Sequence, residues 1–461
     1  MTGLGRAARA ALAGLAALLW ALAPARAADA PNIVIFFADD LGYGGVGVQG
    51  DREAVTPVID SLAATGVRLT NAYANHPVCS PSRAALLTGV YQHRFGFEHN
   101  SGSPQNTSPK FGIAASVPTL PERLKAAGYA TGMFGKWHVG FRPETQPTAR
   151  GFDTFYGHLS GAHAYTPAGR QGRTAILRGT EPAPMPRHLT EQLADEAAGF
   201  IDANKDRPFF VYLPFNAVHS PLDTTPEYLA KFAHVADEKR RTHLAMLLAM
   251  DDAMGRVMDR LKTHGLMGRT LIIFASDNGG PTAETTSSNL PLSGSKGTML
   301  EGGIRVPTLL RWDGVLPAGT VYDGMAMGFD LTATALAAAG VLPERGLDGV
   351  DLVPYLTGER EGSPHEALFW RAGPAGAVRM GAWKMIRVGP DRYLFNLEDD
   401  IAERTDLAST LPGKLAELER AYSAWSGAMM DPLWVRNEGA GGDRPSPDRL
   451  RGAYRELLTG P

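Results

Sequence analysis

Four short apolar runs, each followed at once by polar or charged residues, constrain what this chain can fold into. The runs cover residues 32–38, 130–134, 208–215 and 270–275. Near-continuous apolar runs of this length are typical of strands that are buried on both faces, as in parallel sheets. Helical patterns separate the runs, at 56–65, 116–127, 191–204 and 239–264. This alternation predicts an α/β fold with a large mixed, mainly parallel sheet flanked by helices.

The chain changes character near residue 364. Short strand patterns then follow one another, at 367–371, 377–379, 383–388 and 393–396, and a helical pattern follows at 411–425. We therefore expect a small antiparallel sheet with one helix, which is an α+β subdomain. The expected division is a main domain over residues 29–363 and a C-terminal subdomain over residues 364–461. We expect the Gly- and Pro-rich stretch at 437–448 to be a loop or partly disordered.

The first residues have the pattern of an export signal. Arg6 and Arg9 precede an apolar run at 10–23, and the small residues Ala25 and Ala27 follow it. Because this run is short for a bilayer span, we expect a cleaved signal peptide over residues 1–28 rather than the alternative, a membrane anchor. The mature chain would then be periplasmic or secreted, with no membrane segment. A formal net charge of −3 without a dominant basic patch argues against nucleic acid as a partner.

Two acidic pairs follow apolar runs: Asp39-Asp40 and Asp277-Asn278. Open α/β sheets bind ligands at the carboxyl ends of their strands, so residues far apart in the sequence can meet there. One such pair alone would be read as a loop or helix cap. Two pairs at matching strand ends favour a divalent cation, because buried carboxylates need a partner. Calcium is favoured over magnesium, which usually keeps several waters.

Cys79 is the only cysteine, so no intrachain disulfide can form. One interpretation is that Cys79 is simply a small, buried apolar side chain. However, Pro81 and residues 84–87 indicate a helix that begins near Cys79, with Arg83 one turn along. A helix N-terminus favours negative charge and lowers a thiol pKa, and Arg83 stays charged beside an anion. The residues predict an anion-binding helix start that carries a nucleophile.

The stretch 77–89 resembles the signature of the sulfatase family, which reads Cys-x-Pro-Ser-Arg, then a short apolar run, then Thr-Gly. Four other segments resemble motifs of this family, at 128–138, 216–221, 276–279 and 294–307. Residues 394–397 and 403–408 are similar to its closing subdomain. The resemblance extends over nearly the whole mature chain, and it implies the fold of the alkaline phosphatase superfamily.

The resemblance also implies a chemistry for the site. In this family the cysteine, here Cys79, is oxidised by a maturing enzyme to formylglycine, an aldehyde that hydrates to a diol and attacks the sulfate ester. It implies calcium ligands at Asp39, Asp40, Asp277, Asn278 and the modified residue 79. It implies sulfate contacts from Arg83, Lys136, His138 and Lys296, and a sulfate or leaving-group contact from His219.

Two other functions are compatible with the same scaffold. One is a phosphonate monoester or phosphodiester hydrolase, which Lys136, His138 and Lys296 disfavour. The other, of a different class, is an inactive glycan-binding protein, which the full set of catalytic residue types disfavours. We expect specificity to come from the loops at 95–110 and 158–188, which hold aromatic and polar residues. Export favours a sulfated carbohydrate as the substrate.

Overall fold

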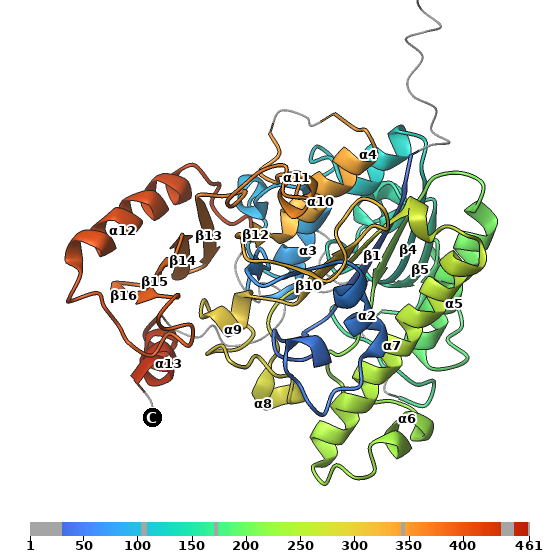
Figure 1. Cartoon of the computed structure of the whole chain (residues 1–461), viewed down its shortest axis with the longest axis horizontal. Helices are drawn as coiled ribbons and strands as arrows, with labels where there is room; N and C mark the ends of the chain where they lie inside the picture. Colours follow the sequence, from blue (N-terminus) through green and yellow to red (C-terminus); the bar gives the residue numbers. More distant parts are fainter. Residues whose placement is uncertain (1–29, 103–107, 170–173, 343–345, 435–446, 460–461) are drawn as a thin grey trace, which may run out of the picture.

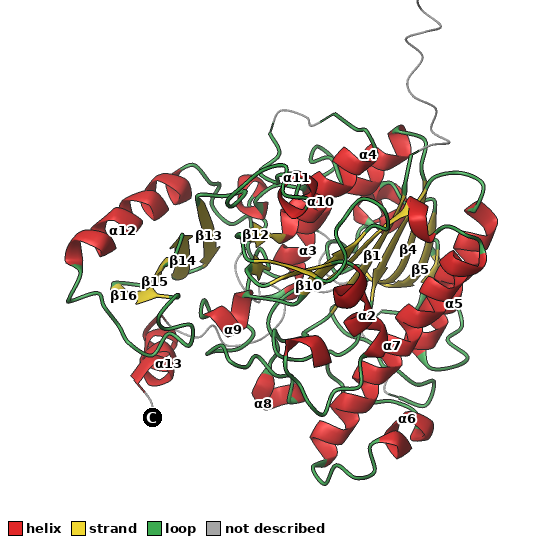
Figure 2. Ribbon diagram, in the orientation of Figure 1, coloured by secondary structure: helices red, strands yellow, loops and turns green. Residues whose placement is uncertain are grey.

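The computed structural model describes residues 30–102, 108–169, 174–342, 346–434 and 447–459. Its centre is a mixed sheet of ten strands (Figures 1 and 2). In spatial order the strands are β11 (Thr320–Tyr322), β2 (Val67–Leu69), β10 (Thr308–Arg311), β9 (Thr270–Ser276), β1 (Asn32–Ala38), β8 (Phe209–Pro214), β4 (Ala130–Lys136), β5 (Thr154–His158), β6 (Leu177–Arg178) and β7 (Glu181–Pro182).

The middle of the sheet is parallel and fully buried. β1 pairs in parallel with β9 on one side and with β8 on the other, and β4 pairs in parallel with β8 and β5. Every residue of β1, β4, β8 and β9 is buried, as expected of strands covered on both faces. The four strands predicted from apolar runs are therefore confirmed. Their carboxyl ends lie at one edge of the sheet.

Helices cover both faces of the sheet (Figure 1). The core on one face includes side chains from α2 (Pro57–Thr65), α5 (Leu189–Asn204) and α7 (Glu238–Thr263). The core on the other includes side chains from α3 (Cys79–Thr88), α4 (Leu120–Ala126) and α10 (Gly328–Ala338). Shorter helices are α6 (Pro226–Lys231), α8 (Thr282–Thr285), α9 (Glu301–Ile304) and α11 (Val353–Leu356). A two-stranded sheet joins β3 (Ala72–Tyr73) to β12 (Ala326–Met327).

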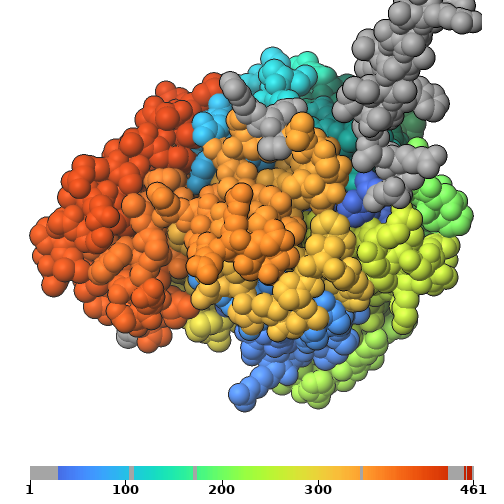
Figure 3. Space-filling model, turned by 45° about the horizontal axis from the view of Figure 1, so that its top comes forward, coloured from blue at the N-terminus to red at the C-terminus, as the bar shows by residue number. Residues whose placement is uncertain are grey.

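The C-terminal subdomain is an antiparallel sheet of four strands in sequence order: β13 (Ala367–Ala372), β14 (Ala375–Met380), β15 (Trp383–Val388) and β16 (Asp391–Asn396). α12 (Pro412–Gly427) packs on it through Leu418 and Tyr422. The expected α+β subdomain is thus confirmed. Figure 3 shows the subdomain, in orange and red, on one side of the molecule and directly against the rest.

The structure differs from the sequence expectations at several elements. The strands β5 and β10 were not predicted, nor was the terminal helix α13 (Pro447–Thr459). α4 begins at Leu120 instead of residue 116, because Thr119 and Glu122 form a capping box there. The expected signal peptide and most of the 437–448 stretch lie outside the described residues. None of the described helices combines the length and the apolar composition of a membrane span.

Candidate active site

The carboxyl ends of the neighbouring strands β1 and β9 bring the two acidic pairs together. Ala38 is in register with Ser276, so the next residues of both strands share one edge of the sheet. The Asp40 backbone N–H donates to Asp277 Oδ1 at 3.1 Å, and Asn278 Nδ2 donates to Asp40 Oδ1 at 2.7 Å. Asp39 and these three residues are buried. The structure thus places four oxygen-bearing side chains at one point, although 237 residues separate Asp40 from Asp277.

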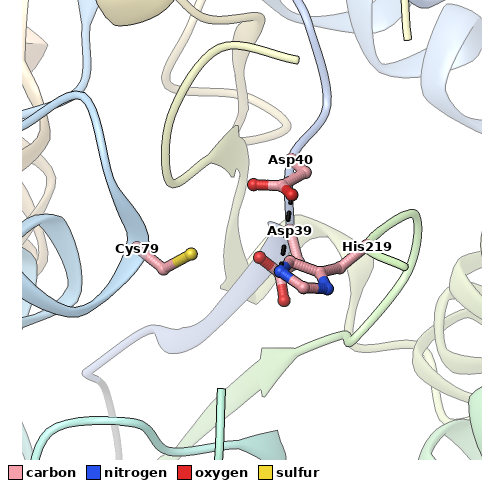
Figure 4. A group of neighbouring side chains, drawn as sticks. All are labelled: Asp39, Asp40, Cys79 and His219. Carbon is pink, nitrogen blue, oxygen red and sulfur yellow. Dashed lines mark ion pairs between the residues drawn. The ribbon is translucent and has the colours of Figure 1, made fainter. Parts of the chain in front are cut away.

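Cys79 is the first residue of α3, and it faces this acidic group. Its Sγ, one carboxylate oxygen each of Asp39 and Asp40, and a ring nitrogen of His219 all lie within 4.8 Å of one another. Figure 4 shows the sulfur pointing toward the two carboxylates, with His219 on their other side. The helix start predicted at Cys79 is confirmed, and Gly89 ends the helix in the left-handed conformation.

The expected fall in the pKa of the Cys79 thiol is wrong for this structure. Burial raises that pKa to about 12, and the nearby Lys136 and Lys296 do not compensate. The thiol is only 2% exposed, so the cost of removing a thiolate from water outweighs the helix N-terminus. A thiol with a raised pKa is a weak nucleophile at neutral pH. Unmodified Cys79 is therefore poorly suited to attack an ester.

Arg83 lies one turn along α3 and links this helix to β9. Its Nε and Nη2 donate to Asp277 Oδ2 at 3.0 and 2.7 Å, and its Nη1 donates to the Lys136 carbonyl at 3.2 Å. Burial alone would raise the pKa of Asp277, but Arg83 and Lys136 lower it to about 2. Arg83 is fully buried and keeps its charge. The Arg83–Asp277 ion pair therefore fixes the position of the start of α3 relative to the end of β9.

Three more basic side chains meet the Asp39-Asp40 pair. Lys136 Nζ, at the end of β4, lies 2.5 Å from Asp39 Oδ2. Lys296 Nζ lies 2.7 Å from Asp40, and His219 Nε2 lies 3.5 Å from Asp40 Oδ2. Burial raises the pKa of Asp39 despite Lys136, whereas His219 and Lys296 outweigh burial and lower the pKa of Asp40. Lys136, Lys296 and His219 therefore lie beside the carboxylates of this pair.

His138 follows β4 in a strained conformation. Its φ is 60°, and Asp40 has a φ of 63°, so two of the four non-glycine residues with positive φ in the described chain belong to this site. Such strain persists where the surroundings hold it and is common at functional sites. Ser80 and Ser101 hydroxyls both donate to the His138 carbonyl, at 2.5 and 3.0 Å. Burial and Lys136 hold the pKa of His138 well below its usual value, so its ring is neutral.

The acidic group is suited to a hard divalent cation. Its donors are carboxylate and amide oxygens, the ligands that calcium prefers. Within the described residues, two buried oxygens of the group, Asp39 Oδ1 and Asn278 Oδ1, have no hydrogen-bond partner. Buried oxygens without partners are costly unless something binds them. The residues Asp39, Asp40, Asp277 and Asn278, with residue 79, fit a cation site.

Sequence reasoning missed two residues near the site. β8 lies between β1 and β4, and Asn216 follows it, so Asn216 is placed between the ends that carry Asp39 and Lys136. Neither polar atom of its buried side chain has a hydrogen-bond partner among the described residues. The rule that predicted Asp39, a polar residue just after a buried strand, would also have predicted Asn216. The Tyr165 hydroxyl donates to the Asn216 and His219 carbonyls, a contact that no local pattern indicates.

A model of the sulfatase family matches residues 31–341 of this chain. The chain belongs to the sulfatase family. It is 33% identical over 459 residues to arylsulfatase J of Mus musculus, and the aligned region covers 86% of this chain and 76% of the relative. It is 34% identical over 379 residues to N-acetylgalactosamine-6-sulfatase of Sus scrofa, over 77% of this chain and 71% of the relative.

Solved structures agree with this assignment. The crystal structure of Ps i-CgsB in complex with k-i-k-neocarrahexaose matches with a TM-score of 0.84 and 33% identity, over 92% of this chain and 98% of that one. As a sulfatase, the chain is a sulfuric ester hydrolase. The predicted family, enzyme class and alkaline phosphatase-like fold are therefore confirmed.

Proposed function

We propose that this sulfatase removes sulfate groups from a carbohydrate outside the cytoplasm, with a formylglycine made from Cys79 and a bound calcium ion. The observation that carries the proposal is the convergence of Cys79 Sγ with Asp39, Asp40 and His219 within 4.8 Å. The four residues come from three separate parts of the chain. Lys136 and Lys296 border the same carboxylates. Buried groups of opposed charge cluster at functional sites, and here they surround residue 79.

Conversion of Cys79 to formylglycine supplies an oxygen nucleophile where the thiol cannot serve. The sequence around Cys79 supports it, and so does the raised pKa of the thiol. The conversion requires a maturing enzyme that acts on the unfolded chain or on an accessible segment, because Cys79 is 2% exposed in the fold. This conversion would also explain why an exported chain contains a single cysteine.

Calcium would be held by Asp39, Asp40, Asp277, Asn278 and residue 79. When bound, it supplies a Lewis acid that lowers the pKa of the nucleophile and offsets charge on the sulfate. Asp277 is kept ionised by Arg83, so one ligand carries a full charge at any pH of interest. The backbone N–H of Asp40 on Asp277 Oδ1 keeps the two pairs in register.

The basic side chains of the site would bind the sulfate oxygens and transfer protons. Lys136 and Lys296 border the carboxylates, so an anion placed there lies within reach of both ammonium groups. His138 is neutral and its Nδ1 has no partner in the described chain, so it can accept a proton from the nucleophile. His219, which is 18% exposed at its side chain, or Lys296 would protonate the leaving oxygen. The positive charge of the Arg83 guanidinium would stabilise the bound sulfate electrostatically.

A sulfated carbohydrate is the substrate that the relatives support. One relative is named for a sulfate on N-acetylgalactosamine, and one solved structure holds a neocarrahexaose. The signal-like residues 1–28 support a periplasmic or secreted enzyme.

The test is anion release from a substrate panel, with protein made in a host able to form formylglycine. The panel holds sulfated glycans, an aryl sulfate, and phosphate mono- and diesters, and ion chromatography measures free sulfate and phosphate. We expect sulfate release from at least one glycan class, and none from a Cys79→Ala variant prepared in parallel. Faster release from phosphodiesters with negligible sulfate would overturn the proposal and favour a phosphodiester hydrolase.

A further inference from the structure

The short helix α9 packs between two active-site segments. The Gly302 N–H donates to the Ser293 carbonyl at 2.7 Å, so α9 contacts the loop 293–298 that carries Lys296. The Gly279 N–H donates to the Gly303 carbonyl at 3.0 Å, so α9 also contacts the segment that carries Asp277 and Asn278. α9 therefore relates Lys296 to the acidic group.

The packing leaves α9 no room to shift. A Cβ atom added to Gly303 would collide with the carbonyl oxygens of Ser295 and Thr298, and one added to Gly279 would collide with the Gly302 carbonyl. These are backbone atoms, which cannot rotate away. A displacement of α9 would therefore move the Lys296 loop, the Asp277 segment or both.

Glu301, the first residue of α9, is held by a buried cluster of charges. Its carboxylate accepts hydrogen bonds from Lys384 Nζ at 2.8 Å, from the Tyr73 hydroxyl at 2.6 Å and from Arg305 Nη1 at 3.2 Å. Glu301 and Lys384 are fully buried. Lys384 belongs to β15, in the C-terminal subdomain, so this contact joins the two parts of the chain (Figure 1).

Glu403 completes the cluster from the segment after β16. Its Oε2 accepts the backbone N–H of Glu301 at 2.6 Å, and its Oε1 lies 2.8 Å from Lys384 Nζ. Glu403 is 2% exposed and has a φ of 55°, a strained conformation that its surroundings hold. Lys384 thus bridges two carboxyl groups, one on each side of the boundary between the main domain and the subdomain.

The cluster is costly to disturb. Burial alone would raise the pKa of Glu301, but Lys384 and Arg305 lower it to about 2. The Glu301 carboxylate is therefore ionised, and Lys384 and Arg305 together balance its charge. Removal of one partner from a buried ion pair leaves an uncompensated charge, which destabilises the surrounding structure.

We propose that Lys384 and Glu403 are positioning residues of the active site: they hold α9 through Glu301 and so fix Lys296 and the Asp277–Asn278 segment relative to each other. The catalytic role of Lys296 in this statement depends on the proposed function, whereas the positioning itself does not. The C-terminal subdomain is then part of the catalytic apparatus, although none of its described residues lies in the acidic group.

Hydrogen exchange measured by mass spectrometry, combined with sulfate release, tests this inference on the full chain. The variant is Lys384→Gln, which keeps a hydrogen-bond donor but removes the charge. The matched control is Arg392→Gln, because Arg392 is a cation of the same sheet that pairs with Glu419 of α12 and not with α9. We expect exchange in the peptide covering 293–304 to speed up at least tenfold in Lys384→Gln, with β1 and β9 still protected. We expect sulfate release to fall at least tenfold, and no change in the control.

The two measurements separate the possible failures. Unchanged exchange at 293–304, or faster exchange confined to β13–β16, would overturn the positioning role even if activity were lost. A wild-type protein without sulfatase activity would refute the proposed function, yet the exchange arm would still decide the positioning. If Lys384→Gln does not fold, Glu403→Gln replaces it, since glutamine keeps the size of the side chain and one acceptor oxygen for the Glu301 N–H.

Discussion

Arg83 on α3 and Asp277 at the end of β9 form a fully buried pair, in which two guanidinium nitrogens donate to the single oxygen Asp277 Oδ2 at 3.0 and 2.7 Å. The other oxygen of Asp277 accepts the Asp40 backbone N–H. One carboxylate thus ties the helix that carries Cys79 to both acidic pairs. The first prediction follows from this relationship.

Asp277→Asn should reduce both calcium affinity and activity. The amide removes the negative charge nearest to Arg83, so a buried cation loses its closest partner, at a cost of about 3 kcal/mol in the free energy of unfolding. We expect calcium affinity to fall at least about tenfold, with sulfate release falling in parallel. Isothermal titration with calcium and thermal unfolding measure the two effects. Asp259→Asn, at an exposed position of α7, is the matched control. Unchanged activity in Asp277→Asn would remove Asp277 from the ligand set.

Cys79→Ser should trap the reaction after one sulfate transfer. A serine hydroxyl can accept the sulfate group, but it lacks the second hydroxyl that would expel it. We expect about one alcohol product per chain in a burst, and an intact mass increased by one sulfate group. Cys79→Ala should show neither. Sustained multiple turnover by Cys79→Ser would contradict the formylglycine mechanism, as would an unmodified thiol at position 79 in fully active wild-type protein.

Calcium removal should lower activity strongly and reversibly. A metal contributes several kcal/mol of transition-state stabilisation, so activity in a chelator should fall roughly a thousandfold. The acidic group would also lose a cation, and the melting temperature should fall. Readdition of calcium should restore both quantities, and magnesium should restore them poorly. Activity that survives prolonged chelation would show that the site works without a metal.

The stability of the wild type should depend on pH through Glu403. Burial raises the pKa of this carboxyl from an ordinary 4.5 to about 7 in the folded chain. Between these two values the folded state holds a proton that the unfolded state has lost, so the free energy of unfolding falls as pH rises. The loss amounts to about 3 kcal/mol over this window. Urea unfolding of wild type and of Glu403→Gln at pH 5 and 7.5 isolates the effect, because other groups cancel in the difference. An equal pH dependence in the two proteins would show that Glu403 does not titrate in this range.

Local patterns were enough to predict the parts of the site that lie within single segments. β1 has the predicted bounds, and α3 begins at Cys79 as Pro81 indicated. Strands that are covered on both faces must be apolar throughout, so the apolar runs identified them directly. Because parallel strands end at one edge, the same runs also predicted which residues would meet. The family motif then added the chemistry of Cys79.

The elements that were missed have weaker local patterns. β10 is a short strand that runs antiparallel to β9, and its pairing is decided by partners far along the chain. α13 has an amphipathic sequence, but the Gly- and Pro-rich stretch before it led to the expectation of a loop. For β10, pairing with distant strands outweighed weak local propensity.

The sequence by itself determined the alternation of strands and helices, the residues at the strand ends and the position of the lone cysteine, because each depends on neighbours close along the chain. Only the tertiary structure decided the electrostatics and the supports of the site. The pKa of Cys79 rises because burial destabilises the thiolate more than the helix N-terminus stabilises it. Lys384 reaches Glu301, 83 residues away in sequence, because two parts of the chain pack together. Burial and long-range contact are properties of the folded molecule, and no local pattern contains them.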